Sequence, residues 1–213
     1  MRKPVFMIVI VLIILGIIWI GYSYLSVRRI EYTKYAVLKK QHGYEIREYD
    51  PFLAAEVVVK GTQKESLRKG FKILFDYISG NNRSQESIKM TAPVTQQSAE
   101  KSERIAMTAP VMQEQGEDSH IVSFMMPANY TSDTVPIPMD SSVKIVQKER
   151  KKVAVLRFAG YATEEKIKKK QARLKELLKG DGYQILSSFQ LALYNPPWTP
   201  PFMRRNEVML LIQ

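Results

Sequence analysis

The feature that most constrains this chain is an uncharged, strongly apolar segment near its N-terminus. Between Pro4 and Val27 no residue is charged, and most are Val, Ile, Leu, Met, Phe or Trp. A helix of about 20 apolar residues spans the ~30 Å hydrocarbon core of a bilayer, whereas the apolar region of a secretory signal is only about 7–15 residues long. We therefore predict a transmembrane anchor over residues 1–29 that contacts the lipid bilayer through residues 5–25. A cleaved signal sequence is the alternative.

The flanking charges bear on the side of the membrane that the rest of the chain occupies. Arg2 and Lys3 precede the apolar segment, and five Lys and Arg residues follow it between positions 28 and 40. An excess of Lys and Arg marks the cytoplasmic side, so the count favours, by a small margin, a cytoplasmic domain on a single-pass N-terminal anchor. Export stays open, because long domains cross membranes with little regard to their charge.

The composition excludes several classes of protein. The 213 residues include no Cys, which removes disulfides, thiolate catalysis, zinc clusters and iron–sulfur sites, and only two histidines, His42 and His120. The net charge of +11 suits nucleic acid or an anionic membrane, but no helix-turn-helix, RNP or zinc-finger pattern accompanies it. We therefore predict no metal site and no nucleic-acid partner, and assign the charge to a solvated surface beside lipid headgroups.

Motifs for catalysis are missing as well. Phosphate-binding and dinucleotide-binding glycine patterns, His-Glu-x-x-His and Gly-x-Ser-x-Gly do not occur. A Ser-His-Asp triad would have to use His42 or His120, which stand in contexts typical of loop and surface residues. The carboxylates of Glu164 and Glu165 suit the first turn of a helix, where negative charge is favourable. We therefore predict that the protein is not an enzyme and has no catalytic residues.

Residues 30–41 are predicted to form a linker, and residues 42–213 a folded domain. Alternation of polar and apolar residues predicts strands at 44–49 and 52–59. The polar–apolar pattern also predicts strands at 121–126, 143–147 and 208–212.

A helix is predicted directly after the second of these strands. Thr62 and Glu65 form a capping box, in which each side chain accepts a hydrogen bond from the other residue's backbone amide at a helix start. An apolar stripe then runs from Leu67 to Ile78, and Gly80 ends the helix.

The same plan occurs twice. It reads strand, helix, strand at 52–59, 62–80 and 87–94, and again at 153–158, 163–180 and 183–194. Two strand–helix–strand–strand modules predict an α+β fold, with a pseudo-twofold antiparallel sheet and both helices packed on it.

A shorter repeat is exact: Met-Thr-Ala-Pro-Val occurs at 90–94 and again at 107–111. Because proline cannot donate to a strand ladder, each copy belongs at a strand end, an edge or a bulge. The polar segment 95–104 between them is predicted to be a hairpin loop.

Aromatic residues of the first helix and of a C-terminal loop suggest a binding cleft. Phe71 and Phe75 belong to the helix stripe, and Trp198 and Phe202 stand in a proline-rich loop. With the cation of Arg68 at its rim, a cleft between helix and loop would suit a flat, apolar molecule with carboxylates at one edge. The alternative is that Phe71 and Phe75 are core residues.

Four sequence strings resemble the SOUL family of haem-binding proteins. They are Tyr-Glu-Ile-Arg-x-Tyr at 44–49, Tyr-Ile-Ser-Gly-Asn at 77–81, Ile-Lys-Met-Thr-Ala-Pro-Val at 88–94 and Arg-Arg-Asn-Glu-Val at 204–208. They occur in the family's order, and the likeness extends from about residue 35 to residue 213.

The resemblance implies a distorted antiparallel β-barrel with two long helices, built from two similar halves, to which this chain adds a membrane anchor. It also implies that haem or another tetrapyrrole binds, as a non-catalytic ligand, in a shallow hydrophobic cleft beside the first helix. Carried over by position, the binding residues are Leu67, Arg68, Phe71 and Phe75 of that helix and Trp198 and Thr199 of the C-terminal loop.

Two positions depart from the family pattern. Some SOUL members ligate iron through a histidine at the variable position of the first string, which is Glu48 here. Others hold porphyrin through apolar contact and pairing of propionates with cations, and this chain is expected to follow them unless His42 reaches the iron. Asp76 stands where one type of relative has a Lys that pairs with a propionate.

These observations predict a membrane-anchored tetrapyrrole-binding protein, a carrier, buffer or sensor of haem or a precursor, that binds without a histidine axial ligand. Two alternatives stay open. One is a non-haem small-ligand-sensing or protein-interaction module of gyrase-inhibitor-like fold tethered to the membrane. The other is an enzyme that acts on tetrapyrroles.

Overall fold

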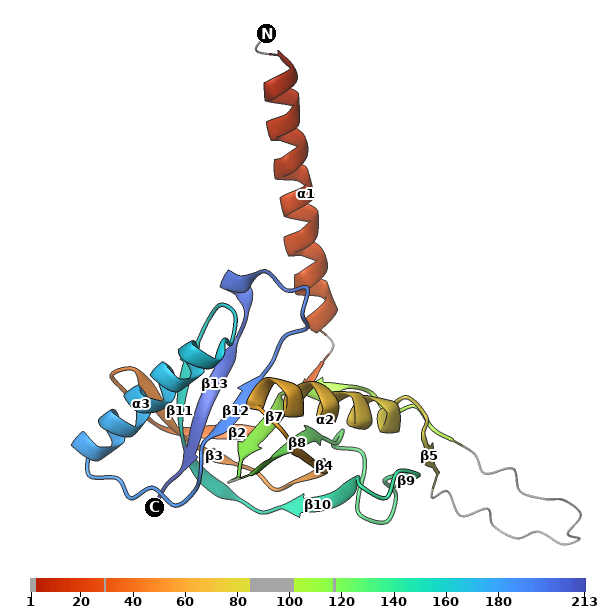
Figure 1. Ribbon diagram of the computed structural model, residues 1–213, viewed down its shortest axis with the longest axis vertical. Coiled ribbons are helices and arrows are strands. Elements are labelled where there is room, and N and C mark those ends of the chain that lie inside the picture. The colour runs from red at the N-terminus through yellow and green to blue at the C-terminus, as the bar shows by residue number, and fades with distance from the viewer. Residues whose placement is uncertain (1–2, 29, 85–101, 117) are drawn as a thin grey trace, which may run out of the picture.

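A nine-stranded antiparallel sheet, curved into a half-barrel, organises the domain and carries two helices on one face (Figure 1). The computed structural model describes residues 3–28, 30–84, 102–116 and 118–213. The helices are α1 (Lys3–Val27), α2 (Gln63–Ile78) and α3 (Glu164–Gly180), with a short 3-10 helix η1 (Pro201–Met203). The strands of the sheet are β2 (Tyr35–Gln41), β3 (Tyr44–Tyr49), β4 (Phe52–Lys60), β7 (Val111–Gln115), β8 (Ser119–Met125), β10 (Lys144–Lys148), β11 (Lys151–Phe158), β12 (Gln190–Leu193) and β13 (Asn206–Leu211).

Two further pairs of short strands lie beside this sheet. The parallel pair is formed by β1 (Glu31–Tyr32) and β6 (Thr108–Ala109), and the antiparallel pair by β5 (Asn82–Arg83) and β9 (Ile137–Pro138).

The strand order reveals two equivalent units. Along the sheet the strands follow each other as β10-β4-β8-β7-β12-β13-β11-β3-β2. One unit is β3-β4-α2-β7-β8 and the other is β10-β11-α3-β12-β13. Outward from the central pair of β7 and β12 come β8 and β13, and then β4 and β11. The first strand of each unit is exchanged: β3 pairs with β11, and β10 pairs with β4. The predicted α+β fold with a duplicated plan is confirmed, and the exchange joins the two units into one sheet.

Two segments differ from what the sequence led us to expect. Residues 30–41, expected to be a linker, contain β1 and β2, and β2 pairs with β3 to form an edge of the sheet. The strand expected over 183–194 is limited to β12 and a single bridge between Ile185 and Ile212. The strand expected at 87–94 and most of the loop expected at 95–104 fall outside the described residues.

The start of α2 has the predicted capping box. Thr62 Oγ1 accepts from the Glu65 backbone N–H at 3.4 Å, and the Thr62 N–H donates to Glu65 Oε2 at 3.2 Å. Gly70 faces β8 so closely that a Cβ there would come within 2.6 Å of Val122. This close approach lets α2 pack directly on β8 and β4, and its residues Leu74 and Tyr77 contribute to the core between them.

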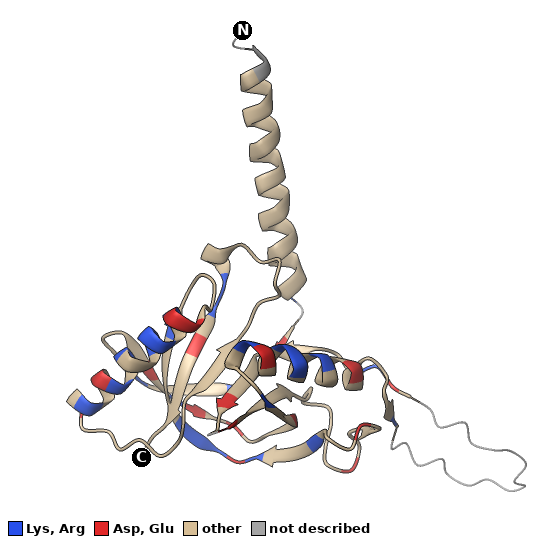
Figure 2. Cartoon of the chain, viewed as in Figure 1, with Lys and Arg blue, Asp and Glu red and all other residues tan. Residues whose placement is uncertain are grey.

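The second helix, α3, covers the other half of the sheet. Thr163 caps it, and Ile167, Leu174 and Leu178 are buried against β11 and β13. The Lys and Arg residues of α3 lie mainly on its outer side, and charged residues also occur along α2, whereas α1 is uncharged from Pro4 to Val27 (Figure 2). Each helix therefore closes its own hydrophobic core on the same face of the sheet.

The N-terminal helix α1 projects away from the domain (Figure 1). Val5–Val27 forms a helix that is long and apolar enough to cross a membrane, and it is the one such helix in the part of the chain that the structure describes. Membrane anchors and signal sequences share this length and composition. The structure thus adds a candidate membrane span to the folded domain.

Candidate functional site

The outer side of α2 carries a pair of exposed aromatic rings. Phe71 is 37% exposed and Phe75 is 48% exposed, so these two side chains are not core residues. Their rings are stacked with centroids 5.8 Å apart and planes inclined by 10°. Phe71 also places its ring edge to face with Phe124 of β8, at a centroid distance of 5.3 Å. The pair therefore exposes apolar ring surface that is held against the core at one end.

Leu67 connects this surface to the interior of the domain. It precedes Phe71 by one helical turn, it is partly buried, and it packs against the core beneath α2. Together Leu67, Phe71 and Phe75 form an apolar strip along one flank of the helix.

Cations accompany the aromatic pair on the same side of α2. Lys64 precedes Phe71 by seven residues, and Arg68 precedes Phe71 by three and Phe75 by seven, the spacing that brings side chains onto one helix face. Arg68 is exposed, and no hydrogen bond or ion pair of its side chain occurs among the described residues. An anionic group next to the rings would therefore find an unengaged guanidinium.

The carboxylate of Asp76 is hydrogen-bonded elsewhere and points away from the aromatic pair. Asp76 Oδ2 accepts a hydrogen bond of 2.6 Å from Asn81 Nδ2, just beyond the end of α2. One residue along a helix corresponds to about 100° of rotation, so Asp76 points well away from Phe75. Its repulsion of a bound carboxylate is consequently weaker than its position in the sequence suggests.

The two predicted loop residues lie beside α1. The carbonyl of Trp198 accepts a hydrogen bond of 2.7 Å from Trp19 Nε1, and the Trp198 side chain is 49% exposed. Thr199 is only 2% exposed, and its hydroxyl has no partner. The six predicted residues thus fall into an α2 group and a loop group. That both groups contact one ligand stays a prediction.

His42 is the candidate iron ligand of the sequence analysis, and Glu48 stands where some family members have a histidine. Glu48 belongs to β3, which lies five strand positions from β8, and it forms an exposed ion pair with Arg150 at 3.2 Å. His42 is exposed in the turn between β2 and β3, and a Cβ on the neighbouring Gly43 would lie 3.8 Å from Leu177 of α3. His120 is different: it lies on β8, two and four residues before Val122 and Phe124, and therefore on the face that α2 covers.

A cavity of about 320 Å³ lies elsewhere, where β1 meets the ends of β4 and β8. Glu31 and Asp50 place carboxylates in its wall, and Lys34 is the cation among its lining residues. An apolar anion would be repelled by this lining, whereas α2 offers cations beside apolar rings. The cavity lining consists of Glu31, Tyr32, Thr33, Lys34, Asp50, Pro51, Phe52, Leu53, Met125, Met126, Pro127, Ala128, Tyr130, Thr131, Ser132 and Gln147.

Two of the strings that resemble the SOUL family meet in a buried ionic network on the opposite face of the sheet. Arg47 Nη1 donates to Glu207 Oε2 at 2.9 Å, and Arg205 Nε donates to Glu207 Oε1 at 2.9 Å. The hydroxyl of Tyr194 also donates to Glu207 Oε2, at 2.8 Å. Glu207 has no exposed surface, so all of its charge is compensated inside the protein. These two strings thus have a structural role, separate from the proposed ligand surface.

Electrostatics hold the members of this network in fixed protonation states. Burial opposes the charge of Arg47, but the Glu207 carboxylate together with Tyr49 and Glu45 outweighs it, and the pKa of Arg47 is raised. Burial, with the negative charge of Glu207, raises the pKa of Tyr194, which therefore remains a hydrogen-bond donor. Sequence reasoning missed this network, because the partners Arg47 and Glu207 are 160 residues apart and no local pattern pairs them.

Comparison with known proteins gives the following likenesses. The family model described as SOUL heme-binding protein matches residues 30–211. Heme-binding protein 2 of Homo sapiens is 30% identical over 171 residues, which cover 79% of this chain and 78% of the relative. Heme-binding protein 1 of Xenopus laevis is 28% identical over 171 residues, which cover 79% of this chain and 83% of the relative.

Solved structures of low sequence identity share the fold. The C-terminal domain of EcmrR matches with a TM-score of 0.56 at 8% identity, covering 84% of this chain and 98% of that domain. A protein described as a hydrolase from Listeria innocua matches with a TM-score of 0.52 at 12% identity, covering 83% and 94%. At these identities the likeness concerns the fold alone.

We predict that Glu207→Ala destabilises the domain by about 3–5 kcal/mol, because it removes the buried counter-charge of Arg205 and leaves Arg47 with the partly exposed Glu45 alone. The control is Glu176→Ala, which breaks an exposed ion pair of 2.9 Å with Arg173 and should cost at most about 0.5 kcal/mol. Urea unfolding of the full chain in detergent measures both. Equal losses in the two variants would contradict a stabilising role for the network.

Proposed function

Because the chain belongs to the SOUL haem-binding protein family, we propose that it is a membrane-anchored protein that binds haem or another tetrapyrrole on α2. The observation that carries this proposal is the exposed, stacked pair of Phe71 and Phe75. Large apolar side chains left in contact with water at adjacent positions mark an interaction surface. Two parallel rings of this kind suit a flat aromatic ligand.

Different residues of α2 would contact different parts of the ligand. Leu67, Phe71 and Phe75 contact the face of the macrocycle, and burial of one such side chain is worth about 1.5–3 kcal/mol. Arg68 and Lys64 pair with the propionates at the edge of the ring, as cations do with carboxylates. The ligand is held without chemical conversion, which agrees with a family of binding proteins.

Binding is proposed to need no axial histidine. His42 and Glu48 belong to the half of the sheet that α3 covers, five or more strand positions from β8. We expect a macrocycle seated on Phe71 and Phe75 to use neither side chain, so that ring burial and propionate pairing supply the affinity. Iron is then not required, and iron-free porphyrin should bind about as well as haem.

The surface position of the site favours a carrier or buffer. A ligand on an exposed helix flank leaves one face open to solvent or lipid, and it can dissociate without any movement of the fold. The candidate span α1 would keep this exchange at the membrane, where apolar tetrapyrroles partition. These features support reversible handling of the ligand over permanent storage.

A second candidate function is the sensing of a different small ligand. The 320 Å³ cavity at β1 has the size of a small-molecule site. Mass spectrometry of ligands that co-purify with the full chain separates the two candidates: a tetrapyrrole supports the first, and a compound of another class supports the second.

Titration of the full chain in detergent with hemin and with iron-free protoporphyrin should give similar affinities. Phe75→Asp removes half of the ring surface and introduces a charge that repels propionates, so both affinities should fall at least tenfold, which corresponds to about 1.4 kcal/mol. Leu186→Asp, at a side chain that is 49% exposed, is the matched control. Unchanged affinity in Phe75→Asp would move the site away from α2.

Replacement of the histidines tests the proposed absence of an axial imidazole. His42→Ala and His120→Ala should each leave the Soret band of the hemin complex unchanged, because the iron is expected to have no histidine ligand. Absorption spectra of the two variants and the wild type are compared at equal hemin occupancy. A shifted Soret band in His120→Ala would identify an axial ligand on β8 and contradict the proposal.

A further inference from the structure

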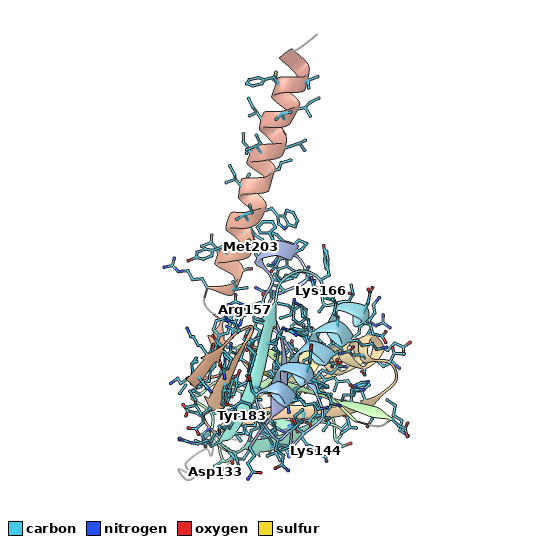
Figure 3. The ribbon with its side chains drawn as sticks, turned by 90° about the vertical axis from the view of Figure 1, so that its left-hand side faces the viewer. Asp133, Lys144, Arg157, Lys166, Tyr183 and Met203 are labelled. Carbon is cyan, nitrogen blue, oxygen red and sulfur yellow. The ribbon has the colours of Figure 1, made fainter. Side chains whose placement is uncertain are left out.

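The loop at 195–203 exposes large aromatic side chains at the end of the domain nearest α1. Phe202 is 68% exposed, more than any other large apolar residue among those described, and Trp198 is 49% exposed. The exposed ring of Tyr161 belongs to the neighbouring turn, which is bonded to the loop by the Gly160 N–H and the Pro201 carbonyl at 2.8 Å. Figure 3 shows Met203, the last residue of the loop, beside the base of α1. Phe202 and Trp198 thus leave much of their ring surface uncovered by the described part of the domain.

One face of α1 is covered by the domain at the level of this loop. Trp19, Ser23 and Val27 are spaced four residues apart and share a helix face. Ser23 is only 1% exposed although its neighbours Tyr22 and Tyr24 are exposed, and Trp19 is bonded to the carbonyl of Trp198. The loop is therefore in contact with the helix well before the helix ends.

This contact sets the depth of the loop if α1 spans a membrane. Trp19 precedes Val27 by eight residues, or about 12 Å along the helix axis. A span of about 20 residues that begins at Val5 ends near Tyr24, which places Trp19 about 7 Å inside the apolar layer. Trp198, bonded to Trp19, then lies at a similar depth. Helices that lie in the membrane interface are buried to a comparable depth of about 5–10 Å.

The backbone of the loop can move from water into lipid with few unsatisfied hydrogen-bonding groups. Four of its nine residues are prolines, which have no N–H group to satisfy. Thr199 N–H donates to the Pro196 carbonyl at 3.1 Å, and Met203 N–H donates to the Pro200 carbonyl at 3.0 Å. An unsatisfied backbone group costs several kcal/mol in lipid, and these internal bonds remove much of that cost.

Charge is kept out of the loop. No residue between positions 195 and 203 is charged, and the loop region is uncharged up to Arg204 (Figure 2). The Arg204 guanidinium packs on the ring of Tyr161 at 4.5 Å and donates to the carbonyls of Thr199 and Pro197. The guanidinium therefore lies at the base of the loop, and its N–H groups satisfy two further backbone carbonyls.

From these observations we propose that residues 195–203 insert into the membrane interface beside α1, with Trp198 and Phe202 among the lipids. This inference rests on the proposed anchoring by α1, and it adds a second point of attachment. Trp and Tyr side chains are enriched at membrane–water interfaces, which is where Trp198 and Tyr161 would then lie. Two attachment points, unlike one, fix the rotation of the domain about the anchor.

The chain contains no Cys, so a single introduced Cys can be labelled with the environment-sensitive fluorophore NBD. The reporter is Phe202→Cys in the full chain, reconstituted into vesicles of phosphatidylcholine and phosphatidylglycerol. Ile13→Cys, in the middle of α1, reports insertion of the anchor. Leu186→Cys reports the opposite end of the domain, since Leu186 is bonded to Leu211 near the C-terminus. Nitroxides on acyl chains near the headgroups quench from the lipid side, and iodide quenches from water.

The proposal predicts that NBD at position 202 emits at shorter wavelength, is quenched by the nitroxide lipid and is protected from iodide, whereas NBD at position 186 shows the reverse. If position 13 is quenched from lipid but position 202 behaves like position 186, the loop does not insert and the anchor stands. If position 202 is protected from both quenchers, a protein contact covers it and the proposal is overturned. If position 13 is open to iodide, anchoring and insertion both fail.

Discussion

The buried interaction of Glu207 with Arg47 and Arg205 holds together parts of the sheet that the chain alone would not join. Arg47 lies on β3 and Glu207 on β13, and β11 separates these two strands in the sheet. The ion pair therefore reaches across a strand and ties the exchanged strand of the first unit to the core of the second. Glu207 and Arg47 are removed from water, and loss of Glu207 takes the carboxylate partner of Arg205 and leaves Arg47 with Glu45 alone. The arrangement therefore reinforces the pairing of strands from both units in one sheet.

The symmetry of the scaffold contrasts with the chemistry of its two helices. The helices α2 and α3 occupy equivalent places on the two units, yet their outer sides differ. On α2 two phenylalanine rings are left in water beside cations, whereas on α3 the outer side is mainly Lys and Arg around buried Ile167, Leu174 and Leu178. The exposed rings that we propose as the binding surface for a flat apolar ligand thus belong to one of the two units. The proposed function lies in this difference, and the shared scaffold supplies its position.

Much of the fold could be predicted because its signals are local. The capping box of Thr62 and Glu65 depends on residues three positions apart, and the alternation in 44–49 reports directly on a half-buried strand. The β2 strand was missed because it lies at the sheet edge and exposes most of its side chains, Lys39 and Lys40 included, so it has no apolar alternation. The reach of Arg47 to Glu207, 160 residues away, could not be read from either string.

The candidate site shows the same limit. Leu67, Arg68, Phe71 and Phe75 follow each other on one helix, so helical spacing alone brings them together. Trp198 and Thr199 were grouped with them by aromatic character and by family position, but their surroundings depend on how the loop meets α1. That contact joins Trp19 to Trp198 across 179 residues, which local sequence patterns do not encode.

The central claim is that a tetrapyrrole is held by ring contact with Phe71 and Phe75. The most direct measurement is NMR of the full chain in detergent, with its eight phenylalanines ¹³C-labelled on the ring, before and after addition of iron-free protoporphyrin. The porphyrin ring current should shift the signals of Phe71 and Phe75 strongly and leave those of Phe158 and Phe189, which pack beneath α3, in place. Shifts confined to phenylalanines other than Phe71 and Phe75 would contradict the account.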